Sequence, residues 1–259
     1  MKPQIIFFDI DGTLVSFKTH CVPASAKSAI ISLRRKGIKV VIATGRVLRE
    51  MNNLGDLEFD GYITANGACC VDAKRNIIAQ YPLSKETLGK LALHLKERPF
   101  PCTFATNEGN FINVVDEQVL MITQLVDLPV PPVKSVSEII EQDVLQLSAF
   151  IDPEREAELL NHVLTDCVSS RWHSSFTDFN VKHCNKATGM DTFLAYFDKE
   201  RKYSMAFGDG GNDISMLKHA ATGIAMDNAG DEVKKVADYV TGSVDEDGIV
   251  NALRYFNLL

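Results

Sequence analysis

Two aspartates, Asp9 and Asp11, follow an apolar run close to the start of the chain. They belong to the segment Asp9-Ile10-Asp11-Gly12-Thr13, which comes directly after Ile5-Ile6-Phe7-Phe8. Carboxylates packed this closely repel one another, so the pair favours a bound cation. On its own, such a pair is more often a turn or a helix cap than a functional site. Its significance therefore depends on what else reaches the same place.

Three further polar residues are expected at the carboxyl ends of strands. Thr44 follows the apolar run 38–43, and Asp209 and Asp213 follow the run 203–207. In an open parallel sheet these strand ends converge on one crevice, so distant residues can meet there. A small set of carboxylate oxygens suits Mg²⁺, which keeps several waters and leaves room for a phosphate oxygen. The sequence thus predicts a magnesium site beside Asp9.

Strands and helices alternate in the first and last parts of the chain. Apolar runs of strand length favour a sheet buried on both faces, which predicts a doubly wound, Rossmann-like parallel sheet. The expected strands are residues 4–8, 38–43, 62–65, 203–207, 223–226 and 239–241. The expected helices are residues 23–36, 44–54, 187–197, 213–221, 231–237 and a last one from 248.

The middle of the chain has a different pattern, in which paired strands are joined by short turns. Helices are expected at 84–98, 116–128 and 153–166, and strands at 102–106, 111–115, 144–151, 169–173 and 176–181. Such pairing is typical of an antiparallel α+β unit. The predicted fold is therefore an α/β core of residues 1–82 and 184–259 with an inserted α+β domain of residues 83–183.

Four motifs, in this order, resemble those of the haloacid dehalogenase (HAD) superfamily. They are Asp9–Thr13, Thr44-Gly45-Arg46, Lys186 and Gly208-Asp209-Gly210-Gly211-Asn212-Asp213. The inserted domain resembles the large class IIB cap of the Cof-type sugar-phosphatase branch. The resemblance covers nearly the whole chain, and the first and fourth motifs are the most specific. The assignment of Lys186 rests on its position before a helix, and Lys182 is its nearby rival.

The resemblance implies a chemistry for the acidic residues. Asp9 would attack phosphorus and become an aspartyl phosphate, a covalent step open to carboxylates. Asp11 would protonate the leaving group and then deprotonate the hydrolytic water. The carboxylates of Asp9 and Asp209 and the backbone carbonyl of Asp11 would hold Mg²⁺. Asp213 would act from behind, steadying the metal or Lys186.

The resemblance also implies a phosphate-binding set and two further contacts. Phosphate binding falls to Thr44, Gly45, Lys186 and Asn212. Thr44 is expected at a helix N-terminus, where backbone amides bind anions; a plain helix cap is the alternative. Gly12 and Arg46 are candidate contacts with the substrate or with a moving flap.

These assignments predict a magnesium-dependent phosphatase of small phosphomonoesters, such as sugar or sugar-alcohol phosphates. One alternative is a phosphosugar mutase, which uses the same aspartyl-phosphate chemistry. Another is a receiver-like binding module phosphorylated on Asp9. Asp11 argues against the module, since an acid/base group beside Asp9 would shorten the life of the phosphoaspartate. In the insertion, Arg171, Trp172 and His173 could line the substrate entrance or lie on an exposed strand.

Composition limits the partners that we expect. The net charge of −7 and the pI of about 5.4 disfavour non-specific nucleic-acid binding, which needs Lys and Arg to neutralise phosphates. No apolar stretch approaches the length of a membrane span, and the first one is too short for a signal peptide. We therefore expect a cytoplasmic monomer or weak dimer whose partner is a small phosphorylated metabolite. Six scattered cysteines are expected to be reduced, buried thiols.

Overall fold

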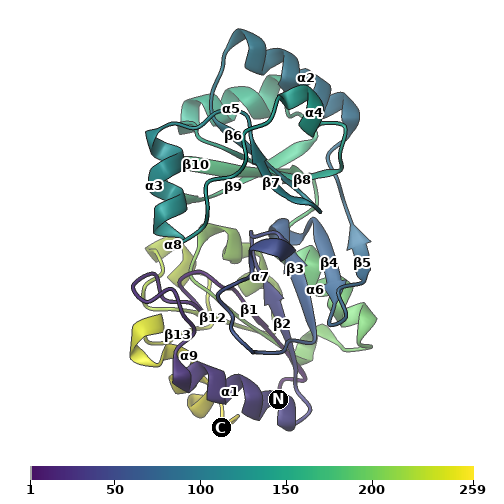
Figure 1. The fold of residues 1–259 in the computed structure, drawn as a ribbon. Helices are drawn as coiled ribbons and strands as arrows, with labels where there is room; N and C mark the ends of the chain where they lie inside the picture. The colour runs from purple at the N-terminus through teal and green to yellow at the C-terminus, as the bar shows by residue number, and fades with distance from the viewer. Residues whose placement is uncertain (1) are drawn as a thin grey trace.

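The structure, a computed structural model, describes residues 2–259 except for the side chain of Trp172. Its larger sheet has eight strands in the order β13-β12-β11-β1-β2-β3-β4-β5, and the six from β13 to β3 run parallel (Figure 1). The strands are β1 (Ile5–Phe8), β2 (Lys39–Ala43), β3 (Gly61–Thr64), β4 (Cys69–Asp72), β5 (Ile77–Gln80), β11 (Ser204–Gly208), β12 (Thr222–Ala225) and β13 (Tyr239–Val240). The predicted fold class is confirmed.

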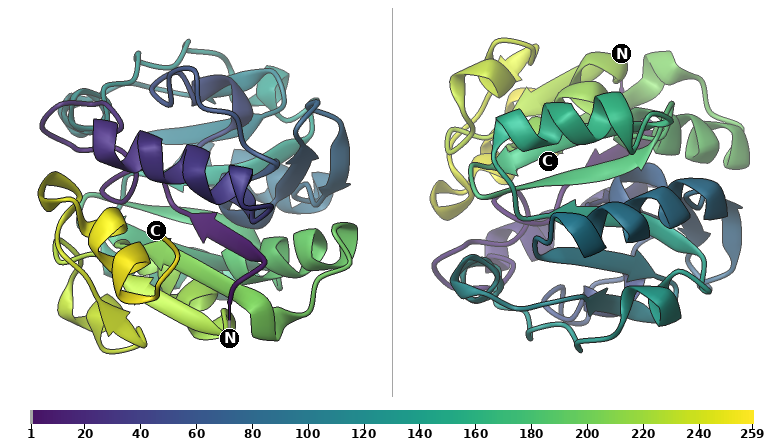
Figure 2. Two further views of the ribbon diagram at one scale, coloured as in Figure 1. Left: turned by 90° about the horizontal axis from the view of Figure 1, so that it is seen from below. Right: turned by 90° about the horizontal axis from the view of Figure 1, so that it is seen from above.

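Helices cover both faces of this sheet because its strands are apolar on both sides. Ile6 and Phe8 pack towards α1 (Ala24–Arg35) and α9 (Gly248–Tyr255), which lie side by side (Figure 2). Ile5 and Phe7 pack towards α6 (Lys186–Tyr196) and α7 (Ile214–His219) on the other face. The short helix α8 (Asp231–Lys234) follows β12. The parallel pairing of β1 with β2 and β11 places Asp9, which directly follows β1, at the edge where these strands end.

The smaller sheet is antiparallel and has the strand order β7-β6-β8-β10-β9. Its strands are β6 (Cys102–Thr106), β7 (Gly109–Ile112), β8 (Val144–Ala149), β9 (Cys167–His173) and β10 (Phe176–Val181). Its helices are α2 (Lys85–Glu97), α3 (Glu117–Leu125), α4 (Val136–Ile139) and α5 (Pro153–His162). Figure 2, seen from above, shows α2 and α5 on the outer face of this sheet.

The two faces of the smaller sheet differ sharply in polarity. Phe104, Leu147 and Phe179 lie opposite one another in register and are buried in one apolar cluster with residues of α2 and α5. The alternate residues Ser148 and Asp178 pair in register on the other face. Side chains alternate along a strand, so this polar face is turned away from the helices and towards the larger sheet.

Three local expectations were wrong. No helix covers residues 44–54, where the described chain has only a 3₁₀ turn, Leu48–Glu50; Asn52, Asn53 and Gly55 are poor helix formers. A hairpin of β4 and β5 extends the larger sheet antiparallel to β3, in a stretch with no expected strand. Strand β7 begins at Gly109, because the turn before it needs only two residues.

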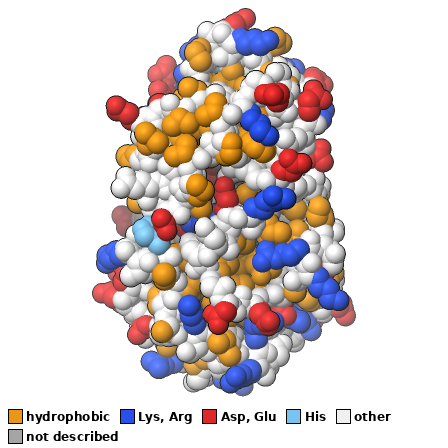
Figure 3. All heavy atoms as spheres, in the orientation of Figure 1, with side chains coloured by type: hydrophobic (Ala, Val, Ile, Leu, Met, Phe, Trp, Pro, Cys, Tyr) orange, Lys and Arg blue, Asp and Glu red, His pale blue; other side chains and the backbone are white. Residues whose placement is uncertain are grey.

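The surface shows no concentration of one sign of charge on the face drawn in Figure 3. Lysine, arginine and acidic side chains are interspersed over it, and groups of hydrophobic side chains are visible on both halves. Among residues 2–259, no helix has the length and apolar character needed to cross a membrane.

Candidate active site

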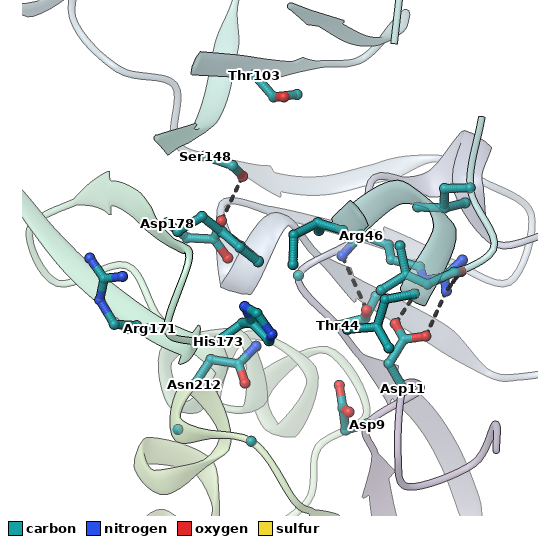
Figure 4. Close-up of a pocket in the computed structure, with 18 of the residues that line it drawn as sticks. Asp9, Asp11, Thr44, Arg46, Thr103, Ser148, Arg171, His173, Asp178 and Asn212 are labelled. Carbon is teal, nitrogen blue, oxygen red and sulfur yellow. Dashed lines mark hydrogen bonds and ion pairs between the residues drawn. The ribbon is translucent and has the colours of Figure 1, made fainter. Parts of the chain in front are cut away.

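Asp9 lies at the carboxyl end of β1 and points into a pocket between the two sheets (Figure 4). Its side chain is buried, and its Oδ1 accepts a hydrogen bond of 2.6 Å from Nζ of Lys186. Lys186 opens α6, and Asn185 caps that helix with its side chain. The resulting charge-assisted contact puts a cation beside the proposed nucleophile.

Lys186 is shared between two carboxylates. Its Nζ also lies 2.6 Å from Oδ1 of Asp213, and both side chains are fully buried. The other oxygen of Asp213 accepts from the backbone amides of Asp209 and Gly210 at 3.0 and 2.9 Å. Asp213 therefore orients both Lys186 and the loop that carries Asp209, and its own oxygens are already engaged.

Asp209 lies at the end of β11, next to β1. Its Oδ1 accepts from the Thr13 hydroxyl at 2.7 Å, and its Oδ2 accepts from Nδ2 of Asn228 at 3.2 Å. The same Nδ2 donates to the backbone carbonyl of Gly12 at 2.8 Å. Gly12 has φ +83°, and a Cβ at this position would lie 2.2 Å from Oδ2 of Asp209. Close approach of the first motif to Asp209 thus requires glycine.

The electrostatics of these carboxylates favour a bound cation. Burial, and then the charge of Asp213, raise the pKa of Asp9 well above its usual range. The same two causes raise the pKa of Asp209 to about 7. Carboxylate oxygens of Asp9, Asp209 and Asp213 all lie within 4.8 Å of one another. A divalent ion with oxygen ligands would relieve this repulsion, so the residues present fit the predicted Mg²⁺.

Asp11 is turned towards Arg46 (Figure 4). Nε and Nη2 of Arg46 donate to its two carboxylate oxygens at 2.7 and 2.6 Å. Arg46 is itself buried and also donates to the backbone carbonyls of Glu50 at 3.0 Å and Val126 at 3.1 Å. Since Val126 follows α3, one arginine connects Asp11 to the part of the chain that carries the smaller sheet.

Thr44 and Gly45 line the same pocket, but they do not begin a helix. The expected helix N-terminus is therefore wrong. The Thr44 hydroxyl instead accepts from the backbone amide of Arg46 at 3.1 Å, which closes a local turn. The Gly45 carbonyl accepts from Nε2 of Gln146 at 3.4 Å, a contact with β8 of the smaller sheet.

Asn212 lines the pocket and contacts Asn66, a residue that the sequence did not indicate for the site. Its Nδ2 donates to Oδ1 of Asn66 at 2.9 Å. Asn66 has φ 53° and is buried, and its own Nδ2 donates to Gln146 and Asp178, each at 3.0 Å. Asn66 therefore joins the fourth motif to the polar face of the smaller sheet.

The pocket encloses about 510 Å³ and is lined from both sheets. Arg171 and His173 line it, which was the less favoured of the two sequence-based interpretations, while the Trp172 side chain lies outside the described part. Arg171 donates from Nε and Nη2 to Glu156 at 3.0 and 2.6 Å. Its charge is thus already paired.

Several residues of the site were not expected. They are Thr13, Glu50, Asn66, Ser148, Asp178 and Asn228. Asn228 could have been found, because it follows β12 and so obeys the strand-end rule that indicated Asp9. Ser148 and Asp178 could not, because their role depends on how the smaller sheet lies over the larger one.

Comparison with known proteins agrees with this geometry. The family model of haloacid dehalogenase-like hydrolases matches residues 6–253. The chain therefore belongs to this family, as its motifs predict. It is a HAD-type phosphatase.

Three relatives illustrate the likeness. The solved structure of the HAD subclass IIB sugar phosphatase BT4131 has a TM-score of 0.92 and 38% identity, over 99% of this chain and 100% of that one. The phosphatase BT1666 of Bacteroides thetaiotaomicron has a TM-score of 0.92 and 37% identity, over 100% and 96% of the two chains. YkrA of Bacillus subtilis, whose name marks it provisionally as a phosphatase, is 31% identical over the full length of both chains.

Proposed function

We propose that this protein is a magnesium-dependent phosphatase that hydrolyses small phosphomonoesters through an aspartyl-phosphate intermediate. The observation that carries the proposal is the buried group at the end of β1, where Lys186 lies between Asp9 and Asp213 at 2.6 Å from each, with Asp209 adjacent. A fixed cation and a metal-binding acidic pair are what a doubly negative phosphoryl group needs beside its nucleophile.

In the proposed mechanism, Asp9 attacks phosphorus while Lys186 stabilises its ionised form. Mg²⁺, held by Asp9, Asp209 and the Asp11 backbone carbonyl, would supply electrostatic stabilisation of the phosphoryl oxygens. Asp11 turns from Arg46 towards the leaving oxygen, donates a proton to it, and later takes a proton from the attacking water. Asp213 keeps Lys186 and the Asp209 loop in position.

We further propose that Thr44, Gly45 and Asn212 contribute to binding the phosphoryl group. Their support is their place in the lining of the same pocket as Asp9. Residues 83–183 would form a cap that excludes water and contacts the rest of the substrate. Sugar or sugar-alcohol phosphates are the proposed substrates, a class supported by the similarity to the sugar phosphatase BT4131. Cytoplasmic location and a monomeric or weakly dimeric state stay predictions.

Phosphate release from p-nitrophenyl phosphate tests the proposal directly. We expect Asp9→Asn and Asp11→Asn each to abolish release in folded protein, as should removal of Mg²⁺ with EDTA. Restoration of activity by added Mg²⁺ is the control for the chelation. Normal turnover by purified Asp9→Asn protein would overturn the mechanism. With a sugar phosphate as substrate, isomerised sugar phosphate among the products would indicate the mutase. A phosphoaspartate stable for many minutes would indicate the binding module.

A further inference from the structure

The pocket has a second half, formed by the polar face of the smaller sheet. Strands β6, β8 and β10 are neighbours, and Thr103, Ser148 and Asp178 pair across them in register. All three line the pocket and lie above Asp9 in the close-up (Figure 4). They form a continuous row of short polar side chains, far from the helices that cover the opposite face.

Asp178 is a buried carboxylate without a cationic partner in direct contact. Its exposed fraction is 3%, and its oxygens accept from the Ser148 hydroxyl at 2.6 Å and from Nδ2 of Asn66 at 3.0 Å. Burial raises its pKa to about 6, although these hydrogen bonds and the more distant charge of Lys186 favour the ionised form. Each oxygen can accept a further hydrogen bond, since a carboxylate has about four acceptor positions.

Asn110, on β7, offers a second acceptor to the pocket that it lines. Its Nδ2 donates to Oε1 of Glu50 at 2.6 Å, which fixes the orientation of the amide. Its Oδ1 is buried and has no hydrogen-bond partner within the described residues. A buried carbonyl oxygen without a partner is unfavourable, so a small shift of the Asn110 side chain that brings this oxygen to a ligand hydroxyl would gain a hydrogen bond.

The positive charges that line the pocket are already neutralised. Arg46 is paired with Asp11 and Arg171 with Glu156. Nδ1 of His173 accepts a hydrogen bond from the Ser175 backbone amide at 3.2 Å. Within residues 2–259, no lysine lines this pocket. A second anionic group on the ligand would therefore meet acceptors and carboxylates without a free cation.

We propose that the cap half of the pocket selects phosphomonoesters whose leaving group is a neutral polyol and rejects those that carry a second negative charge. Asp178 and Oδ1 of Asn110 accept hydrogen bonds from the hydroxyl groups of the polyol. A carboxylate at the same place would leave both acceptors unpaired and lie beside the charge of Asp178. This inference rests on the proposed phosphatase function and specifies its substrate class.

The matched pair of sorbitol 6-phosphate and 6-phosphogluconate tests this selection. The two compounds share carbon chain and phosphate and differ at the far end, where a primary alcohol replaces a carboxylate. At pH 7.5 with Mg²⁺ we expect kcat/KM to favour sorbitol 6-phosphate by about 100-fold. This is the size of effect expected when one buried ligand carboxylate is repelled by the carboxylate of Asp178. Asp178→Asn should reduce this preference about tenfold, because the repelling charge is gone.

Two other variants complete the test. Glu154→Gln removes an exposed charge on α5, on the far side of the sheet, and should leave the preference within about twofold. Asn110→Leu should lower the kcat/KM of sorbitol 6-phosphate relative to p-nitrophenyl phosphate about tenfold, because the latter has no hydroxyl donor to lose. This second variant keeps the proposal testable if Asp178→Asn protein does not fold.

Binding separates failure of this inference from failure of the proposed function. The Kd of each compound for Asp9→Asn protein, measured by calorimetry, needs no turnover and should show the same preference. Equal affinity and equal kcat/KM for the pair would overturn the inference while leaving a phosphatase. An unchanged preference in folded Asp178→Asn protein would overturn the role of Asp178. Wild-type protein that binds with the preference but releases no phosphate would refute the proposed function alone.

Discussion

Two buried aspartates, one beside each sheet, differ in the groups that stabilise their negative charge. Asp213, beside the larger sheet, accepts from Lys186 at 2.6 Å and from two backbone amides. Asp178, on the smaller sheet, accepts from a hydroxyl and an amide only, and burial raises its pKa to about 6. One carboxylate is neutralised by a fixed cation, and the other keeps its charge without direct compensation.

This difference matches what each half of the pocket has to bind. Under the proposed function, the larger sheet would receive the charged part of the substrate, where carboxylates lie beside Lys186 and could hold a metal. The smaller sheet would receive the remainder, for which uncharged donors and free acceptors are sufficient. Fixed dipoles and charges around the reacting group need no rearrangement during the reaction.

Removal of the cation from the larger sheet should have the largest effect. Lys186→Met leaves Asp9 and Asp213 buried and unpaired, so the free energy of unfolding should fall by about 3–5 kcal/mol. Urea unfolding in EDTA measures it, since bound Mg²⁺ would mask part of the loss. Lys182→Met, at the exposed rival position, should change stability by less than about 0.5 kcal/mol. Equal effects of the two substitutions would mean that Lys186 is not the compensating cation.

Gly12→Ala should displace Asp209 without removing a charge. Its Cβ would lie 2.2 Å from Oδ2 of Asp209, so we expect kcat/KM to fall about 100-fold, or ~2.7 kcal/mol. Gly37→Ala is the matched control, because Gly37 has φ +78°, close to the +83° of Gly12, but nothing within 4 Å of its Cβ position. Both variants carry the same backbone strain. Phosphatase activity should therefore fall only in Gly12→Ala protein.

The larger sheet's part of the site was largely predictable because it follows from order along the chain. A strand that ends in an aspartate delivers that aspartate to the edge where other strands end, so Asp9 and Asp209 could be placed together. The HAD motifs then indicated Lys186 and Asp213. The same local reasoning failed at Thr44, where the hydroxyl accepts from the Arg46 amide within a turn and no helix follows.

The smaller sheet's part was not predictable for a physical reason. The strands of that sheet could be recognised as paired runs joined by short turns, but such pairing does not say which face of the sheet meets which neighbour. The bond from Arg46 to the Val126 carbonyl and those from Asn66 to Gln146 and Asp178 join residues at least 80 positions apart. They exist only once the two sheets are placed over one another.

The charge of Asp178, which no cation contacts directly, should appear in the pH dependence of stability. Below pH ~4 the carboxyl is protonated in both states; between ~4 and ~6 the folded state holds a proton that the unfolded state has released, so stability falls as pH rises. Asp178→Asn abolishes this contribution. Relative to wild type, its free energy of unfolding should therefore rise by ~2 kcal/mol between pH 4.5 and 7.5. A pH-independent difference would show that Asp178 is compensated like Asp213.

Contact between the two halves should give the smallest effect. Gly211 belongs to the loop that carries Asp209 after β11, and a Cβ there would lie 2.6 Å from the backbone carbonyl of Arg171 on β9. Gly211→Ala should push the halves apart and lower kcat/KM for a sugar phosphate about tenfold, or ~1.4 kcal/mol. Gly89→Ala, in α2 with nothing within 4 Å of its Cβ position, should keep full activity and gain up to ~1 kcal/mol of stability. If Gly211→Ala lowers kcat/KM for p-nitrophenyl phosphate as much as for the sugar phosphate, the contact orders the catalytic loop and does not hold the smaller sheet over the substrate.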